Sequence, residues 1–273
     1  MNEIAFSKMT GLGNDFIFIN NVDGKYNNII NNIIKNIPKL CKRAISIGAD
    51  GLVIIEKSKL ADFSWKFYNS DGSIAEMCGN AARCAAKYAY LNGIADKKMS
   101  FETIAGIINA EIINELLVKA ELTKPWGLEV DKNIIVDEIE YNISIINTGV
   151  PHVVVFVDNV DDVNVQILGS KIRNHKKFTP KGTNVNFCKV LNEHSIIIRT
   201  YERGVEGETL ACGTGALASA IISNERNMTT YPIEVTTRSG GIIKIIYEGS
   251  SYYIEAEARL VYRGFFYKEA YMY

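Results

Sequence analysis

The 273-residue sequence lacks several features that mark particular classes of protein. Its first residues, MNEIAFSKMTGLGNDF, contain no basic segment followed by a long apolar one, which argues against a secretory signal peptide. No run approaches about 18 consecutive apolar residues, so no membrane-spanning helix is expected. Acidic and basic residues nearly balance, at 31 and 30, which argues against nucleic-acid and membrane-surface partners. We therefore expect a cytoplasmic protein.

Cysteine and histidine are also scarce, with five and three residues. An odd number of cysteines in a chain of this length is not typical of a disulfide framework. Structural zinc is poorly supported, because Cys78 and Cys84 are farther apart than a zinc-ligand pair and no second pair follows. No cofactor is expected either. The segment TGLGND lacks the third glycine of a dinucleotide-binding fingerprint, and ACGTGA is not a phosphate-binding loop.

What the sequence does contain is an internal repeat. The segment CGNAARCAA from Cys78 resembles CGTGALASA from Cys212, and the two are 134 residues apart (212 − 78 = 134). A second match joins TGLGNDFIFI from Thr10 to TGVPHVVVFV from Thr148, with an offset of 138 (148 − 10 = 138). Because the matches follow in the same order at nearly one offset, they predict two similar halves.

The two halves also share their expected secondary structure. Short runs rich in β-branched and aromatic residues, among them HVVVFVD, SIIIRTYER and SYYIEAEARLVYRG, predict strands. Alanine-rich segments predict one helix over residues 79–91 and another from Gly213 to about Asn224, each closely packed on every side. We therefore expect an α+β protein of two pseudo-symmetric domains, each a curled, mostly antiparallel sheet wrapped on a central helix.

The junction between the halves is expected near LTKPWGLEV, where Pro125 and Gly127 interrupt the pattern. This places an N-terminal half at residues 1–124 and a C-terminal half at residues 125–261.

Each repeat places a cysteine directly before the first turn of its buried helix. The unpaired N–H groups and the positive dipole at a helix N-terminus lower the pKa of a nearby thiol and bind carboxylates. An approximate twofold axis would set the two thiols on opposite sides of one bound carboxylate. Such a pair can invert a stereocentre, since a thiolate removes a proton from one face and a thiol delivers one to the other. The spacing also fits a duplicated pair of structural cysteines, as expected for Cys41, Cys84 and Cys188.

Four segments resemble the diaminopimelate epimerase family, in the family's order: KMTGLGNDF, YNSDGSIAEMCGNAARC, NTGVPHVVVF and YERGVEGETLACGTGA. The resemblance runs along essentially the whole chain. It implies a cofactor-independent isomerase that interconverts LL- and meso-2,6-diaminoheptanedioate, in lysine and peptidoglycan precursor biosynthesis. It also implies a homodimer, and a last segment, residues 262–273, that returns to the N-terminal half.

The resemblance further implies roles for individual residues. Cys78 and Cys212 match the acid/base pair, and His152 matches a histidine near the catalytic thiols. The expected substrate-binding residues are Asn14, Asn69, Gly79, Asn80, Asn184, Glu202, Arg203, Gly213 and Thr214. Arginine can clamp a carboxylate and glutamate can pair with an ammonium group, as this substrate requires. From the residues alone, the two asparagines at 14 and 69 also fit turns, and the Glu–Arg pair also fits a solvated strand end.

Three positions depart from the usual family pattern. Val150, Gly51 and Ala81 stand where asparagine, glutamine and glycine are frequent, and Val150 removes one amide contact to the distal end of the substrate. The alternative function is a racemase of another amino acid on the same fold, such as histidine or proline. Proline racemases have Cys-Gly-His where this chain has Asn80, and phenazine-biosynthesis-type isomerases lack the cysteine pair. A non-enzymatic metabolite-binding protein would need neither cysteine.

Overall fold

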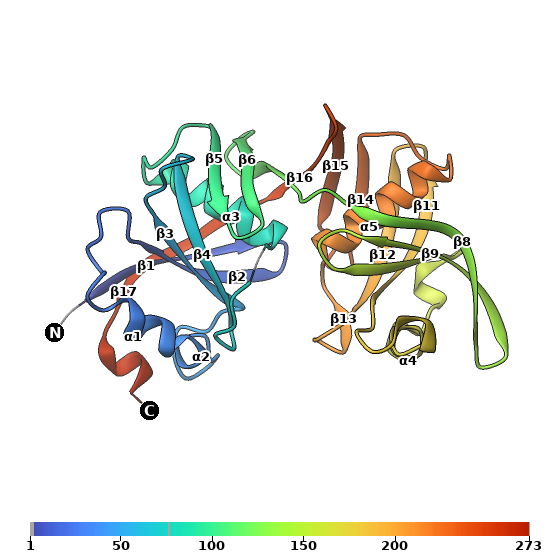
Figure 1. The fold of residues 1–273 in the computed structure, drawn as a ribbon, viewed down its shortest axis with the longest axis horizontal. Coiled ribbons are helices and arrows are strands. Elements are labelled where there is room, and N and C mark those ends of the chain that lie inside the picture. Colours follow the sequence, from blue (N-terminus) through green and yellow to red (C-terminus); the bar gives the residue numbers. More distant parts are fainter. Residues whose placement is uncertain (1–2, 76, 273) are drawn as a thin grey trace. The chain divides into compact units, whose positions relative to one another are not determined.

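The structure, a computed structural model, describes residues 3–75 and 77–272. The chain divides into two compact units, which Figure 1 shows coloured along the sequence. Unit 1 comprises Met1–Glu121 and Ala256–Tyr273, and unit 2 comprises Leu122–Glu255. Each unit is a sheet with a central helix, so the predicted α+β class is confirmed. None of the helices that the structure describes is long and apolar enough to span a bilayer.

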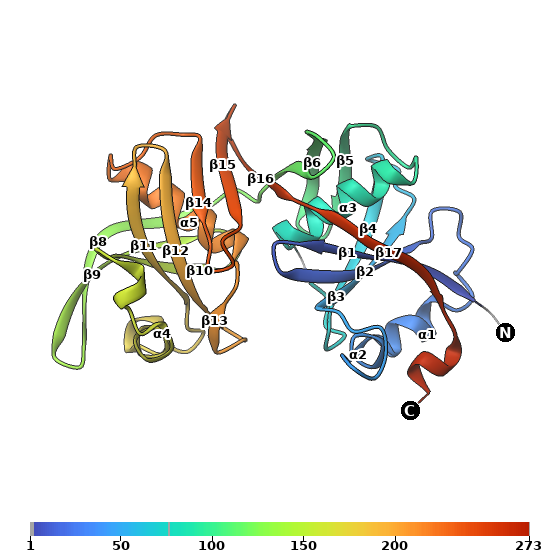
Figure 2. The same cartoon turned by 180° about the vertical axis from the view of Figure 1, so that it is seen from behind.

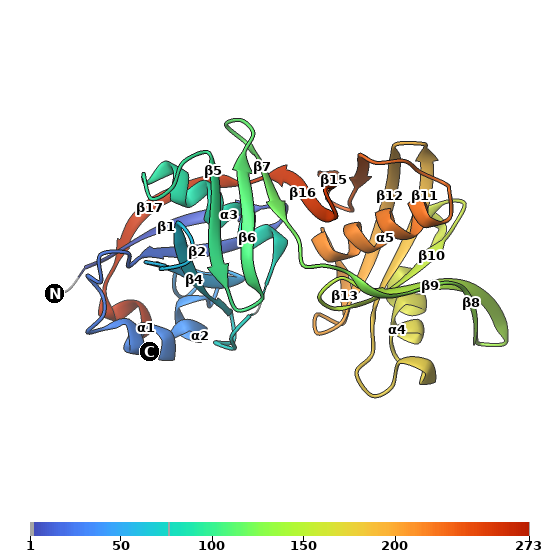
Figure 3. The ribbon, with the colours of Figure 1, turned by 45° about the horizontal axis from the view of Figure 1, so that its top comes forward.

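Unit 1 is a mixed sheet built around one buried helix. Across the sheet, its strands are β17 (Arg259–Phe266), β1 (Ile4–Gly11), β2 (Asn14–Asn20), β3 (Gly51–Glu56), β4 (Phe63–Asn69), β5 (Lys98–Thr103), β6 (Gly106–Ile112) and β7 (Leu117–Glu121). Neighbours are antiparallel except β2–β3 and β4–β5, which are parallel. The central helix α3 (Gly79–Leu91) packs against β1, β2, β3, β6, β7 and β17 (Figure 3). Two short helices, α1 (Ile30–Lys35) and α2 (Ile37–Leu40), connect β2 to β3.

Unit 2 repeats this plan. Across the sheet, its strands are β8 (Trp126–Val136), β9 (Ile139–Asn147), β10 (Pro151–Phe156), β11 (Asn184–Asn192), β12 (Ser195–Glu202), β14 (Ile233–Thr236), β15 (Ile242–Glu248) and β16 (Ser251–Glu257). Its parallel pairs are β10–β11 and β12–β14, and the other neighbours are antiparallel. The central helix is α5 (Gly213–Glu225), the short strand β13 (Gly207–Thr209) pairs with β12, and α4 (Val165–Arg173) lies between β10 and β11. Unit 2 also contains the 3₁₀ turns η1 (Val160–Asp162) and η2 (Lys176–Phe178), and the C-terminal segment of unit 1 contains η3 (Lys268–Tyr271).

The two sheets therefore follow the same order of strand pairings. In the chain, each central helix comes before the equivalent strand, β5 in unit 1 and β14 in unit 2. Both helices are 13 residues long, and they begin 134 residues apart (213 − 79 = 134). The outer strand is the exception, as Figure 2 shows. β8 precedes β9 in the chain, whereas its counterpart β17 reaches β1 from the C-terminal end. The repeat in the sequence is thus a repeat of architecture.

Small side chains allow each sheet to close around its helix. Every residue from Gly79 to Ala89 is buried in α3, and every residue from Gly215 to Ser223 is buried in α5. Alanine and glycine bring strand and helix backbones close together, since they add little volume between them. The helices are consequently fixed in position, and so are the residues at their N-termini.

The run SYYIEAEARLVYRG, for which strand structure is expected, forms two strands, β16 and β17. The strand breaks at Ala258, whose N–H donates to the Leu116 carbonyl at 2.9 Å. Before the break β16 pairs with β15, and after it β17 pairs with β1. A continuous β-branched and aromatic composition does not reveal a change of partner, because pairing depends on residues far away in the sequence.

Candidate active site

Cys78 and Cys212 occupy the same position in the two units, directly before the first turn of the central helix. Both are N-cap residues with extended backbones, at φ −149° and ψ 121° for Cys78 and φ −129° and ψ 107° for Cys212. Their carbonyls accept the first helical hydrogen bonds, from the N–H of Ala82 at 2.8 Å and of Ala216 at 2.9 Å. Each thiol therefore lies beside the unpaired N–H groups and the positive dipole end of a helix.

In unit 1, the predicted residues Asn14 and Asn80 are brought into direct contact. A two-residue turn at Leu12 and Gly13, with φ 50° and 91°, closes the β1–β2 hairpin and makes Asn14 the first residue of β2. The Asn80 side-chain amide donates to Asn14 Oδ1 at 2.7 Å, and Asn14 Nδ2 donates to Asp50 Oδ2 at 3.1 Å. The Asp50 carboxylate therefore fixes the orientation of the Asn14 amide beside the first turn of α3.

Asn69 lies at the end of β4, where its side chain is exposed. Its Nδ2 donates to Ser73 Oγ at 2.9 Å, and its N–H donates to the Ser73 carbonyl at 2.9 Å, so it stabilises a turn. In the part of the chain that the structure describes, no hydrogen bond joins Asn69 to Asn14 or Asn80. Strand register places Asn69 opposite Gly51, and Gly51 opposite Phe16, at the same end of the sheet as Asn14.

In unit 2, the Cys212 sulfur contacts the predicted residue Thr214. The Sγ–Oγ1 distance is 3.5 Å, and the Thr214 carbonyl accepts a hydrogen bond from Thr148 Oγ1 at 3.0 Å. Burial raises the pKa of the Cys212 thiol well above its ordinary value, and the negative charge of Glu202 raises it further. Hydrogen bonds from Thr214 and from the Gly215 N–H act in the opposite direction. The expected lowering of the thiol pKa at a helix end is therefore wrong for Cys212, because desolvation outweighs the helix end.

The other polar residues predicted in unit 2 gather where β10, β11 and β12 meet the YERG turn. Thr209 Oγ1 donates to Glu202 Oε1 at 2.7 Å, which orients this carboxylate. Asn184 Oδ1 accepts from the Arg203 N–H at 2.9 Å, and Asn184 Nδ2 donates to the Pro151 carbonyl at 3.1 Å. Asn184 thus anchors the turn that carries Arg203, a half-buried residue. Its guanidinium donates to the Lys181 carbonyl at 3.3 Å and could clamp a carboxylate.

His152 is fully buried, and its two ring nitrogens have different surroundings. Burial lowers the pKa of His152 to about 3, and the positive charge of Arg203 acts in the same direction, so the ring is neutral at neutral pH. Nδ1 lies 3.1 Å from Asn186 Nδ2, and Asn186 Oδ1 accepts from Thr200 Oγ1 at 2.9 Å, which orients the amide as a donor to Nδ1. The ring proton is then on Nε2, a buried atom without a hydrogen-bond partner among the described residues.

Three of the polar residues that orient these side chains were missed by sequence reasoning: Asp50, Thr148 and Asn186. Asn186 packs against the helix so closely that a Cβ on Gly215 would lie 2.3 Å from its Oδ1. A signal for it exists in NVNF, because Asn184 and Asn186 alternate with apolar residues and therefore share one face of a strand. The other two had no such signal, since their roles depend on residues more than 30 positions away.

The donor set does not resemble a metal centre. Within residues 3–75 and 77–272, no three His, Cys, Asp or Glu side chains are grouped so that they could hold a metal ion. All five cysteines are thiols, and burial raises the pKa of Cys41 and Cys84 to about 12.

The sequence matches the family model for diaminopimelate epimerase over residues 6–125 and 144–259. A diaminopimelate epimerase from Aquifex aeolicus is 48% identical over 250 residues, covering 89% of each chain. One from Hydrogenobaculum sp. is 43% identical over 273 residues, covering 96% of this chain and 98% of the relative. One from Archaeoglobus fulgidus is 41% identical over 278 residues, covering 96% and 95%.

Solved structures of more distant proteins share the fold. A phenazine biosynthesis protein from Bacillus anthracis has a TM-score of 0.69 at 14% identity, covering 98% of this chain and 100% of its own. A probable proline racemase from Agrobacterium radiobacter has a TM-score of 0.70 at 13% identity, covering 96% and 92%. At such identities the likeness extends to the fold alone. The family model and the relatives above 40% identity match the sequence itself along most of its length. They show that the chain belongs to the diaminopimelate epimerase family.

Proposed function

We propose that this chain interconverts LL- and meso-2,6-diaminoheptanedioate without a cofactor, by moving protons at one α-carbon. The observation that carries the proposal is the placement of Cys78 and Cys212 at equivalent helix N-caps in a chain of this family. The reaction needs one group to take a proton from one face of the carbon and another to supply a proton to the opposite face. A thiolate and a thiol can perform both steps and exchange roles in the reverse direction.

In this mechanism the first thiolate removes the α-hydrogen as a proton and becomes a thiol. The electron pair left on the α-carbon is delocalised into the α-carboxylate. The second thiol then donates its proton to the opposite face and becomes a thiolate. We assign the helix-end groups Gly79, Asn80, Gly213 and Thr214 to binding this carboxylate, because N–H groups and a helix dipole stabilise the developing negative charge without rearranging.

The remaining polar residues are assigned to the other charged groups of the substrate. The Arg203 guanidinium would bind a carboxylate, Glu202 an ammonium group, and Asn14, Asn69 and Asn184 the remaining polar atoms. The buried Nε2–H of His152 needs an acceptor, and a substrate carboxylate or a thiolate would supply one. Val150 and Gly51 carry no side-chain polar group at positions where other members of the family often do.

Two further properties belong to the proposal. We propose a homodimer, as is common in the family, and a cytoplasmic location, because catalytic thiols need a reducing compartment.

The test is incubation of the purified protein with LL-diaminopimelate under reducing conditions, with L-proline and L-histidine in parallel. We expect the meso isomer to form from LL-diaminopimelate, with no inversion of the other two amino acids. Inversion of proline or histidine at a comparable kcat/KM would favour the alternative racemase. Absence of inversion for all three substrates would contradict both functions.

A further inference from the structure

Arg83 is a charged side chain inside unit 1 that none of the roles above uses. It lies in α3, five residues after Cys78 (83 − 78 = 5), and is 0% exposed. It is the bulkiest of the fully buried side chains in the described part of the protein. Charged side chains are rarely buried completely unless they are paired, because desolvating an unpaired charge is costly.

The guanidinium of Arg83 binds neutral acceptors. Nη2 donates to Asn80 Oδ1 at 2.7 Å, Nη1 donates to the Gly79 carbonyl at 3.0 Å, and Nε donates to the Glu257 carbonyl at 3.4 Å. Two of these acceptors belong to the first turn of α3, and Asn80 in turn binds Asn14. The positive charge therefore lies directly beneath the helix end that carries Cys78.

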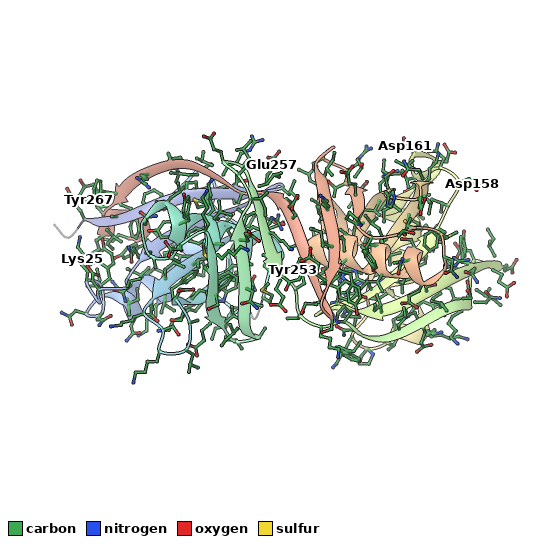
Figure 4. The ribbon with its side chains drawn as sticks, turned by 90° about the horizontal axis from the view of Figure 1, so that it is seen from above. Lys25, Asp158, Asp161, Tyr253, Glu257 and Tyr267 are labelled. Carbon is green, nitrogen blue, oxygen red and sulfur yellow. The ribbon has the colours of Figure 1, made fainter. Side chains whose placement is uncertain are left out.

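Two described carboxylates linked to the hydrogen-bond partners of Arg83 are engaged with other residues. The Glu257 side chain, labelled in Figure 4, pairs with Arg259 at 2.6 Å, and Glu257 offers Arg83 only its main-chain oxygen. Asp50 binds the Asn14 amide and pairs with Arg43 at 2.9 Å. Within residues 3–75 and 77–272, no carboxylate forms an ion pair with Arg83. Among the described residues, its charge is thus not compensated by an acidic side chain.

In the described part of the chain, the ionisable groups that act on Arg83 are the two sulfur atoms of Cys84 and Cys78. Burial lowers the pKa of Arg83 to about 10, and negative charge on Cys84 or on Cys78 would raise it. The guanidinium is therefore protonated at neutral pH. Burial raises the pKa of Cys84 to about 12, so this residue stays a thiol. Cys78 is less buried than Cys84 and is the neighbour that can carry the balancing negative charge.

Unit 2 shows the opposite arrangement at the same place. The α5 position equivalent to Arg83 is Leu217 (83 + 134 = 217), which is buried and apolar. The charged group beside Cys212 is Glu202, which favours the protonated thiol. The two units thus differ, with a positive charge under Cys78 and a negative charge beside Cys212.

We propose that Arg83 is a positioning residue for the catalytic pair, whose buried charge holds Cys78 as the resting thiolate while Cys212 rests as the thiol. The inference rests on the proposed function for its meaning in catalysis, although the two protonation states can be measured without substrate. A conversion that starts from Cys78 as the base leaves Cys78 protonated and Cys212 ionised. Arg83 and Glu202 both favour the original distribution, so they return the pair to its resting state between turnovers.

The test is the pH dependence of alkylation at each cysteine of the full-length protein, without substrate. A short pulse of iodoacetamide followed by peptide mass spectrometry gives a separate midpoint for Cys78 and for Cys212. Arg83→Gln keeps amide donors but removes the charge, and Arg83→Lys keeps the charge. Leu217→Met is the matched control, since it alters the equivalent position of α5 without changing a charge.

In the wild type, we expect the Cys78 midpoint to lie below the Cys212 midpoint. In Arg83→Gln the Cys78 midpoint should rise by about one pH unit or more, with little change at Cys212. Arg83→Lys should stay closer to the wild type than Arg83→Gln, and Leu217→Met should leave the Cys78 midpoint unchanged.

An unchanged Cys78 midpoint in a folded Arg83→Gln protein, judged by circular dichroism, would overturn the proposal. An equal rise at both cysteines would do the same. A wild-type midpoint for Cys78 above that of Cys212 would overturn it even if the glutamine variant did not fold. Because the readout requires no turnover, it is independent of whether the wild type inverts diaminopimelate.

Discussion

Helices α3 and α5 are equivalent in length, burial and position within sheets of the same strand order, yet the groups around their first turns differ in charge. In α3 the buried Arg83 binds Gly79 and Asn80, whereas in α5 the equivalent residue is Leu217 and Glu202 acts on Cys212. The shared architecture positions two thiols in the same way. In the proposal above, the charges beside the two helix ends determine which thiol is ionised at rest.

The largest effects should come from removing either member of the equivalent pair. We expect Cys78→Ala and Cys212→Ala each to lower kcat for epimerisation by at least about a thousandfold, because one acid/base group is lost. Cys84→Ala is the control in the same helix and should keep most of the activity. Measurement of kcat for the three variants tests the acid/base roles of Cys78 and Cys212. A Cys84→Ala protein as inactive as the other two variants would contradict these roles.

The next effect concerns the space around each helix. Gly215→Ala would place a Cβ 2.3 Å from Asn186 Oδ1, whereas the equivalent residue of α3 is already Ala81 (215 − 134 = 81). We expect Gly215→Ala to cost about 1–3 kcal/mol in free energy of unfolding, since the packed interior must shift. It should also lower kcat, because Asn186 orients His152.

The matched variant for this comparison is Ala81→Gly. It should lower the free energy of unfolding by about 1 kcal/mol through helix propensity and leave kcat nearly unchanged. Urea denaturation and initial rates measure both quantities. Equal losses of activity in the two variants would mean that the contact with Asn186 has no special role.

An intermediate effect on stability should come from His152, which has no histidine counterpart in β2. Between pH 6.5 and about 3 the unfolded chain binds a proton that the folded protein rejects, since burial lowers the pKa of His152. Stability should therefore fall as the pH is lowered through this window, by up to about 1.4 kcal/mol per pH unit from this residue.

Urea denaturation of His152→Gln between pH 7 and pH 5 checks this contribution. The variant should show a shallower loss of stability on acidification than the wild type. His194→Gln, which changes an exposed residue of a turn, is the control and should follow the wild type. Identical slopes for His152→Gln and the wild type would contradict the buried neutral ring.

The smallest effect should be a shift at Cys212 itself. Glu202→Gln removes the negative charge that raises the pKa of Cys212, so the alkylation midpoint of Cys212 should fall by up to about one pH unit. Glu208→Gln breaks the pair with Arg199 on neighbouring strands and is the control, with no shift expected at Cys212. A Cys212 midpoint that rises in Glu202→Gln would reverse the sign assigned to this carboxylate.

Much of the fold follows from the sequence because local signals agree with one another. The helix predicted at residues 79–91 is found with those bounds, and the Cys-Gly repeat predicted its counterpart. The short helix α1, with the sequence INNIIK, was not predicted. Isoleucine and asparagine have low helix propensity, and α1 is held by the burial of Ile30 and Ile33 in the core of unit 1.

The sequence predicts where the two cysteines lie relative to the central helices, but it does not predict whether each thiol is ionised. The repeat located both cysteines and both helix ends from spacing alone. The state of each thiol depends on how deeply it is buried and on which charges lie beside it, and the sequence carries neither quantity. Arg83 had no distinguishing pattern within CGNAARCAA, and the burial that gives it a role arises only when the sheet closes around α3.

The most direct test of the central claim is epimerisation of LL-diaminopimelate in deuterium oxide, followed by mass spectrometry of both isomers at early times. Two cysteines on opposite faces predict meso product that carries one solvent deuterium at the inverted α-carbon, while recovered LL substrate still carries hydrogen. Deuterium in recovered LL substrate as early as in the product would indicate one base acting on both faces. That result would contradict the account of Cys78 and Cys212 as an acid/base pair.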